Sequence, residues 1–197
     1  MANCASKYKY LDRIIKGDLD VRQECIECHN YLKYDDSIYN NLVFHASKKG
    51  KYADCLMYSG ATNFIIISKK ALELFKTNRL TGFEEYPITI IDDKENIFDQ
   101  YYILKITGNA LLDYGKMGEQ PKFYCKKCGY VEYSGQRPMN YKQTYLIEES
   151  WDGSDFFLDD LCTQRVVDII LKNKLKGFII TELINAYNPF NMNYINT

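Results

Sequence analysis

Histidine, proline and tryptophan are scarce in this sequence of 197 residues, which has two histidines, four prolines and one tryptophan. Only His29 and His45 could therefore act as a histidine base. The sequence also contains no nucleophile elbow, no phosphate-binding glycine loop and no zinc-protease motif. These absences exclude the familiar enzyme classes that depend on such motifs, and we expect a protein that is not an enzyme.

Long hydrophobic runs and an excess of positive charge are also lacking. The apolar runs, such as FIII and VVDIIL, are far shorter than the roughly 18 residues that span a bilayer. The start, MANCASKYKYLDRIIKGDLD, has no apolar segment of a signal peptide, so Cys4 is not expected to be lipidated. The formal net charge of −1 provides no basic surface for nucleic acid or anionic lipid. We therefore expect a cytoplasmic protein with no nucleic-acid and no membrane partner.

A repeat within the sequence indicates how the chain is organised. SKKALELFKTNRLTGF (68–83) aligns without gaps on TQRVVDIILKNKLKGF (163–178). In each copy we expect a hydroxyl to cap the start of a helix, an asparagine to end it in a left-handed conformation, and a glycine to turn the chain into a strand. These residues are Ser68, Asn78 and Gly82 in the first copy and Thr163, Asn173 and Gly177 in the second.

Strand-like runs surround both copies. NFIIIS and DFFLDD precede the predicted helices, and FEEYPITII and FIITELI follow them. Further strands are expected at Leu42–His45, Tyr101–Thr107, Tyr130–Tyr133 and Tyr145–Glu148. We therefore expect an α+β fold with a mainly antiparallel sheet and few helices, in one domain over 1–197. It would contain two related halves, about 20–100 and 101–185, and a polar tail, 186–197, that is loose at its end.

Two Cys-x-x-Cys motifs, in RQECIECHNY and FYCKKCGY, carry the strongest chemical signal. Each short turn can direct two thiolates at one ion, so that Cys25, Cys28, Cys125 and Cys128 would complete a tetrahedral, structural Zn²⁺ site that joins the two halves. Such a site is closed and suits a scaffold better than catalysis. Redox-active pairs and free thiols remain alternatives, and His29 could perturb the site or replace a cysteine ligand.

The remaining residues of interest have ordinary structural interpretations. Cys55 and Cys162 are expected to be small apolar packing residues, whereas Cys4 has no partner spacing. Trp151 is expected to pack over the turn at Asp152 and Gly153, or to anchor an interface. Adjacent acidic pairs belong to solvated loops but could together meet a basic partner; they are Asp35–Asp36, Glu84–Glu85, Asp92–Asp93, Glu148–Glu149 and Asp159–Asp160.

The order of these motifs over residues 20–185 is similar to a known family. The two distant Cys-x-x-Cys motifs, FIIISKKALELFKTNRLTGFEEYPI and WDGSDFF…TQRVVDIILKNKLKGFIITEL resemble the double-CXXCG-motif family of bacterial immunity proteins and neighbouring immunity families. The first motif departs from that pattern because His29 follows the second cysteine where the family has glycine. The resemblance implies a cytosolic antitoxin that binds and blocks a cognate protein toxin. A zinc-ribbon-like nucleic-acid or regulatory module and a thiol oxidoreductase are the alternative hypotheses.

Overall fold

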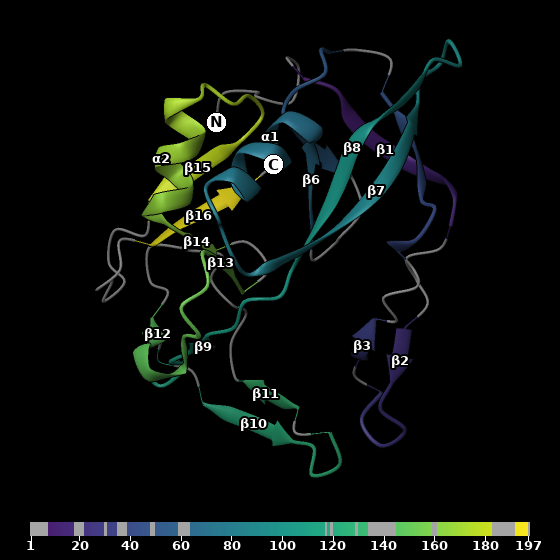
Figure 1. Cartoon of the computed structure of the whole chain (residues 1–197). Helices are drawn as coiled ribbons and strands as arrows, with labels where there is room; N and C mark the ends of the chain where they lie inside the picture. The colour runs from purple at the N-terminus through teal and green to yellow at the C-terminus, as the bar shows by residue number, and fades with distance from the viewer. Residues whose placement is uncertain are drawn as a thin grey trace.

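The computed structural model describes residues 8–17, 22–29, 31–34, 39–47, 50–58, 64–116, 118, 120–128, 130–133, 145–158, 161–182 and 192–196. Within these ranges the chain is built mostly of strands, with two α-helices, α1 (Lys69–Thr77) and α2 (Gln164–Lys172), and a 3₁₀ turn at Glu148–Ser150 (Figure 1). The α+β class with few helices is therefore confirmed.

A closed barrel of six strands forms the larger part of the fold. In order around the barrel these are β1 (Tyr10–Lys16), β4 (Val43–Ala46), β7 (Phe83–Ile91), β8 (Ile97–Ile106), β6 (Phe64–Ser68) and β5 (Cys55–Tyr58). The β1–β5 and β4–β7 pairs are parallel and the other neighbours are antiparallel. Apolar side chains from successive strands fill the barrel, among them Leu11, Phe44, Ile90 and Ile103, each fully buried.

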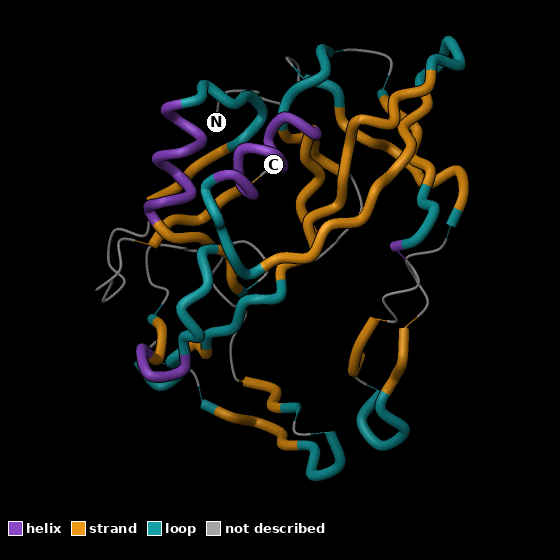
Figure 2. The backbone as a smooth tube through the Cα atoms, viewed as in Figure 1, coloured by secondary structure: helices purple, strands orange, loops and turns teal. Residues whose placement is uncertain are grey.

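A second, open sheet contains four strands in the order β13 (Phe156–Phe157), β14 (Leu161–Thr163), β16 (Met192–Asn196) and β15 (Ile179–Glu182). All its pairings are antiparallel. Three two-stranded pairs complete the described fold. They are β2 (Arg22–Glu24) with β3 (Tyr31–Tyr34), β10 (Pro121–Tyr124) with β11 (Val131–Tyr133), and β9 (Leu111–Leu112) with β12 (Leu146–Ile147). Two of them, the β2–β3 and β10–β11 hairpins, lie apart from the two sheets (Figure 2), whereas β9–β12 packs against the second sheet through Leu146.

The order of elements repeats along the chain. Eight strands with α1 between the sixth and seventh span Tyr10–Ile106, and eight strands with α2 in the same place span Leu111–Asn196. The strand order β5-β6-β8-β7 in the barrel has the same pattern as β13-β14-β16-β15 in the second sheet. The repeat is thus longer than the 20–100 and 101–185 suggested by sequence, because the short strands at its ends carry no recognisable motif.

Both helices begin and end in nearly the same way, with two differences from the sequence prediction. The Ala71 N–H donates to the Ser68 hydroxyl over 3.2 Å, as expected of a cap, but Thr163 makes no such cap. The asparagines do not adopt the left-handed conformation; their side chains instead donate to the carbonyls of Leu74 and Ile169, each over 2.8 Å. The residues after them, Arg79 and Lys174, take positive φ values of 53° and 52°.

The C-terminal region differs most from expectation. The predicted loose tail contains β16, which lies between β14 and β15 and bonds to both. A polar segment can form a strand when its neighbours supply the pairing, so tertiary context overrides composition here. The run DFFLDD likewise forms β13 only at Phe156–Phe157, and β14 lies between it and α2.

One apolar cluster joins the two halves. It contains residues of both helices and both sheets, including Ile67 and Phe75 from the first half and Val166 and Ile170 from the second. The Phe75 ring lies 5.4 Å from that of Phe156, centroid to centroid. Since both helices bury their apolar stripes in this shared cluster, the halves fold as one unit.

Candidate metal centre

The two Cys-x-x-Cys motifs lie at the turns of the β2–β3 and β10–β11 hairpins. In the first hairpin Arg22 is opposite Tyr34 and Glu24 is opposite Tyr31, which leaves Cys25 and Cys28 in the connecting turn. The second hairpin places Cys125 and Cys128 in the same way, and the Cys125 N–H donates to the Tyr130 carbonyl over 2.8 Å. The hairpins lie near one another at one end of the molecule (Figure 1).

The four sulfurs gather in one cluster although the motifs are 100 residues apart. Sγ of Cys25 lies 3.8 Å from Sγ of Cys125, and Sγ of Cys28 lies 3.6 Å from Sγ of Cys128. All four sulfurs lie within 4.8 Å of one another. A tetrahedron with metal–sulfur bonds of about 2.3 Å has edges of about 3.8 Å, whereas a disulfide requires about 2.05 Å. The residues therefore fit a four-coordinate metal ion, and the thiols are free.

The surroundings of the sulfurs tune their protonation. The N–H groups of Cys28 and Glu27 donate to Cys25 and lower the pKa of its thiol to about 6. The Tyr130 N–H also lowers the pKa of Cys128, but burial and the neighbouring Cys125 and Cys25 outweigh it, so this pKa is raised. A metal ion binds thiolates rather than thiols, so binding would release the remaining protons.

His29 occupies the position where the second motif has glycine. Its φ is +55°, a left-handed conformation in which histidine is enriched among the non-glycine residues. The His29 N–H donates to the Cys25 carbonyl over 2.8 Å, and the side chain is exposed. Histidine therefore replaces glycine as the turn residue, and the cluster that could hold a metal consists of the four cysteines.

The other described cysteines are packing residues, as expected. Cys55 and Cys162 are 2% and 0% exposed and belong to the apolar cluster between the halves. Burial raises the pKa of both thiols, with a smaller contribution from the nearby Asp54 and Asp155 respectively. Cys4 lies outside the described residues.

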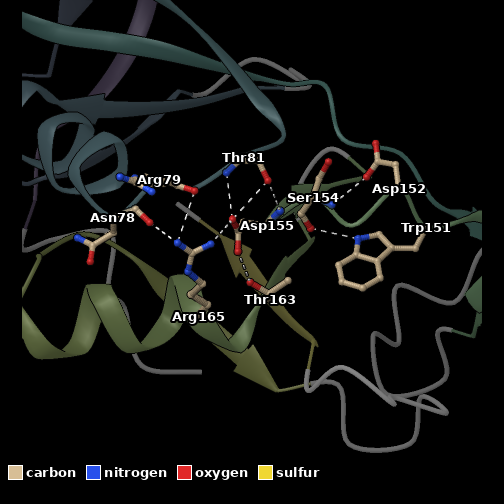
Figure 3. A network of polar contacts seen from close by, with 9 residues as sticks. All are labelled: Asn78, Arg79, Thr81, Trp151, Asp152, Ser154, Asp155, Thr163 and Arg165. Carbon is tan, nitrogen blue, oxygen red and sulfur yellow. Dashed lines mark hydrogen bonds and ion pairs between the residues drawn. The ribbon is translucent and has the colours of Figure 1, made fainter.

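A buried aspartate from the second half holds the loop after α1. Asp155 accepts hydrogen bonds from the Thr81 N–H, the Thr163 hydroxyl and the Arg165 guanidinium, each over 3.0 Å (Figure 3). The same guanidinium donates to the Asn78 carbonyl. Figure 3 shows the side chains of Asp155, Thr81, Thr163 and Arg165 converging where α1 and α2 meet. This contact ties the two copies of the repeat together.

The corresponding contact in the other direction is made by Asp54 of the first half. Its carboxylate accepts the Ser68 hydroxyl over 3.2 Å and the Lys176 N–H over 2.9 Å. Ser68 aligns with Thr163 and Lys176 aligns with Thr81, so each aspartate makes equivalent contacts with its own half and with the other half. Sequence reasoning missed both aspartates because their spacing to the hydroxyl that they accept differs: Asp54 lies 14 residues before Ser68, whereas Asp155 lies 8 residues before Thr163.

Several other predicted features have structural roles. Trp151 donates from Nε1 to the Ser154 carbonyl over 3.1 Å and packs near Phe157, which confirms packing at this turn. His45 lies on β4, with its ring nitrogens 2.8 Å from Asp12 and 3.2 Å from Asp93. The adjacent acidic residues on β7 and after it each contact another side chain of this protein. Glu84 contacts Lys105, Glu85 contacts Lys76, Asp92 contacts Asn96, and Asp93 contacts His45. Asp35–Asp36 and Asp159–Asp160 lie outside the described residues.

Comparison with protein-family models finds no matching family, and comparison with curated proteins finds no match. In the part of the chain that the structure describes, neither helix has the length and apolar character needed to cross a bilayer.

Proposed function

We propose that this chain is an immunity protein, an antitoxin that binds a cognate bacterial protein toxin in the cytoplasm and occludes it, and that its four clustered cysteines hold a structural Zn²⁺ ion. The sequence motifs described above, in their order along the chain, support the immunity assignment. The observation that carries the structural part is the convergence of the four sulfurs at tetrahedral spacing.

The cysteine geometry supports binding rather than chemistry. Four thiolates fill the coordination sphere of Zn²⁺ and leave no position for a reacting water or substrate. Cys25 and Cys125 are 1% and 3% exposed, so two of the four sulfurs are poorly accessible to substrates, while Cys28 and Cys128 are half-buried. A centre of this kind fixes the relative position of two hairpins and thereby shapes a surface.

Metal analysis tests the structural part. A four-sulfur site accepts zinc and iron in principle, so both metals are measured. The chain purified without added metal should contain one zinc and no iron per molecule. Cys28→Ser and Cys128→Ser should each lower the zinc content well below one, whereas Cys55→Ser should leave it unchanged.

Protection tests the antitoxin part. The antitoxin hypothesis predicts that a large secreted protein with a variable C-terminal domain is encoded beside the gene for this chain, and that C-terminal domain is the probe. Expression of that domain in a host should arrest growth, and co-expression of this chain should restore it. An unrelated toxin serves as the control and should remain toxic. If the chain neither binds nor neutralises the adjacent domain, the proposal is wrong.

The zinc-ribbon-like nucleic-acid module is the second candidate. It is favoured by the exposed sequence Lys122-Phe123-Tyr124 on β10 and by Lys126 and Lys127 in the following turn, because ribbons that bind single strands combine cations with aromatic side chains. Binding to a single-stranded RNA oligonucleotide that weakens steeply with salt would support it. The thiol oxidoreductase has less support, because both motifs lie in hairpin turns rather than at the start of a helix.

A further inference from the structure

The four sulfurs of the candidate metal centre differ in how easily a small oxidant can reach them. Cys25 and Cys125 are 1% and 3% exposed, whereas Cys28 and Cys128 are half-buried. When a metal ion is bound, all four sulfurs are thiolates, so their exposure rather than their protonation decides which of them is oxidised first. Each hairpin therefore offers one reachable sulfur.

The two reachable sulfurs lie in contact across the hairpins. Sγ of Cys28 is 3.6 Å from Sγ of Cys128, so the two atoms must approach by about 1.5 Å to form a disulfide of about 2.05 Å. Within the described chain, each strand of these hairpins pairs only with the other strand of its own hairpin. Because such a lone hairpin is marginally stable, the rest of the fold offers little resistance to this approach.

The two buried sulfurs form a second pair of the same kind. Sγ of Cys25 lies 3.8 Å from Sγ of Cys125, again with one sulfur from each hairpin. Once the reachable sulfurs are bonded to each other, these two are the sulfurs that remain in the cluster. Both bonds across the hairpins can therefore form without an exchange of partners, whereas a bond within one motif would join a reachable sulfur to a buried one.

We propose that the cysteine cluster is a site of reversible oxidation by peroxides, in which Cys28 bonds to Cys128 and Cys25 bonds to Cys125, the metal ion is released and the two hairpins stay joined. The release of zinc rests on the proposed function, while the pairing of the sulfurs rests on their geometry alone.

The electrons and atoms balance with hydrogen peroxide as the oxidant. A thiolate attacks one peroxide oxygen and breaks the O–O bond, which gives a sulfenic acid and, with one proton, a water molecule. The thiolate of the other hairpin then attacks the sulfenic sulfur and, with a second proton, displaces a second water. Each disulfide therefore consumes two thiolates, two protons and one peroxide. Two peroxides oxidise the whole cluster, and since metal binding requires thiolates, Zn²⁺ leaves with its charge unchanged.

Peptide mapping tests the pairing, because the sequence allows all four cysteines to be separated. Cleavage after glutamate separates the cysteines of the first motif at Glu27, and cleavage after lysine separates those of the second motif at Lys126 and Lys127. Each possible disulfide thus joins two peptides with a distinct summed mass. The zinc-loaded chain is treated with two equivalents of hydrogen peroxide, its remaining thiols are blocked, and it is digested without reductant.

We expect the peptide pair that joins Cys28 to Cys128 to appear first and the buried pair to follow, with the loss of four thiols and one zinc per chain. Cys55 and Cys162 should remain thiols, because they are 2% and 0% exposed in the apolar cluster between the halves. Cys55→Ser is the control variant and should leave the products and the loss of zinc unchanged. Dithiothreitol and added zinc should restore the thiols and the metal content.

The outcomes are distinct. Disulfides within the motifs, from Cys25 to Cys28 and from Cys125 to Cys128, would overturn the inference, as would a cluster that keeps its thiols under peroxide. If the purified chain contains no zinc, the metal part of the proposed function fails, and the same mapping on that metal-free chain decides the pairing separately: bonds across the hairpins support the oxidation site, and bonds within the motifs overturn it.

Discussion

Replacing Asp155 with alanine should destabilise the fold more than any comparable surface change. Asp155 is 5% exposed, and its carboxylate accepts hydrogen bonds from the Thr81 N–H, the Thr163 hydroxyl and the Arg165 guanidinium. Each hydrogen bond to a charged acceptor contributes about 1.5–3 kcal/mol, but the Arg165 side chain is 52% exposed, so solvent screens its ion pair and it counts for little. The two threonine contacts then give a loss of about 3–6 kcal/mol in the free energy of unfolding.

Urea denaturation of the zinc-loaded protein measures this loss. Asp54→Ala is the internal comparison, because Asp54 makes the equivalent contacts but its side chain is more exposed, at 14%. We expect about 2 kcal/mol for Asp54→Ala and under about 0.5 kcal/mol for the exposed Asp99→Ala. If Asp155→Ala were no more destabilising than Asp99→Ala, the contact between the halves would have no energetic role.

Three further predictions concern other parts of the fold. Titration of the metal-free chain, followed by ultraviolet thiolate absorbance, should show one thiol ionising near pH 6, and Cys25→Ser should remove that step. Because folding lowers the pKa of the Cys25 thiol, the stabilisation that the thiolate provides is fully present above the ordinary thiol pKa and is lost as the pH falls through about 6. Gly177→Ala should lower the free energy of unfolding by at least about 2 kcal/mol, measured in urea, because φ is +93° and the added Cβ would lie 2.1 Å from the Cys55 carbonyl oxygen. Gly153→Ala is the control and should lower the free energy of unfolding by less, because the space around Gly153 is open. Tyr52→Phe should raise the free energy of unfolding by about 1 kcal/mol, and with it the melting temperature, because the buried Tyr52 hydroxyl has no hydrogen-bond partner among the described residues. A melting temperature below that of the parent protein would contradict this.

The sequence predicted the local structure of the repeat well where the chain determines its own conformation. FEEYPITII forms β7 with the expected bounds, and the helix after Ser68 begins at the predicted cap. These features depend on interactions within a few residues, and such interactions are visible in sequence. The turn within each Cys-x-x-Cys motif is also local, whereas the meeting of the two motifs, 100 residues apart, depends on the fold and was predicted only from the ligand chemistry of four cysteines.

What could not be predicted depends on contacts between distant segments. β16 forms from a polar segment because β14 and β15 offer it two edges. Closure of the barrel requires β4 to pair in parallel with β7, where Val43 lies opposite Thr89, and no short motif encodes that pairing. Thr163 resembles a cap in sequence, yet its hydroxyl is bound to Asp155 and does not cap α2.

The sheet of the first half closes into a barrel and the sheet of the second half stays open, and this difference bears on how the two halves contact each other. The first half closes its sheet through the β1–β4, β4–β7 and β1–β5 pairs. In the described part of the second half, β9 and β12 pair only with each other, and a single bridge from Gly108 to Phe157 stands in the place of the β1–β5 pair. The open sheet contacts the first half at the shared apolar cluster and at Asp54 and Asp155. Among the described residues, the β10–β11 hairpin belongs to neither sheet and meets the first half at the cysteine cluster, so the surface that this hairpin presents depends on the four sulfurs staying together.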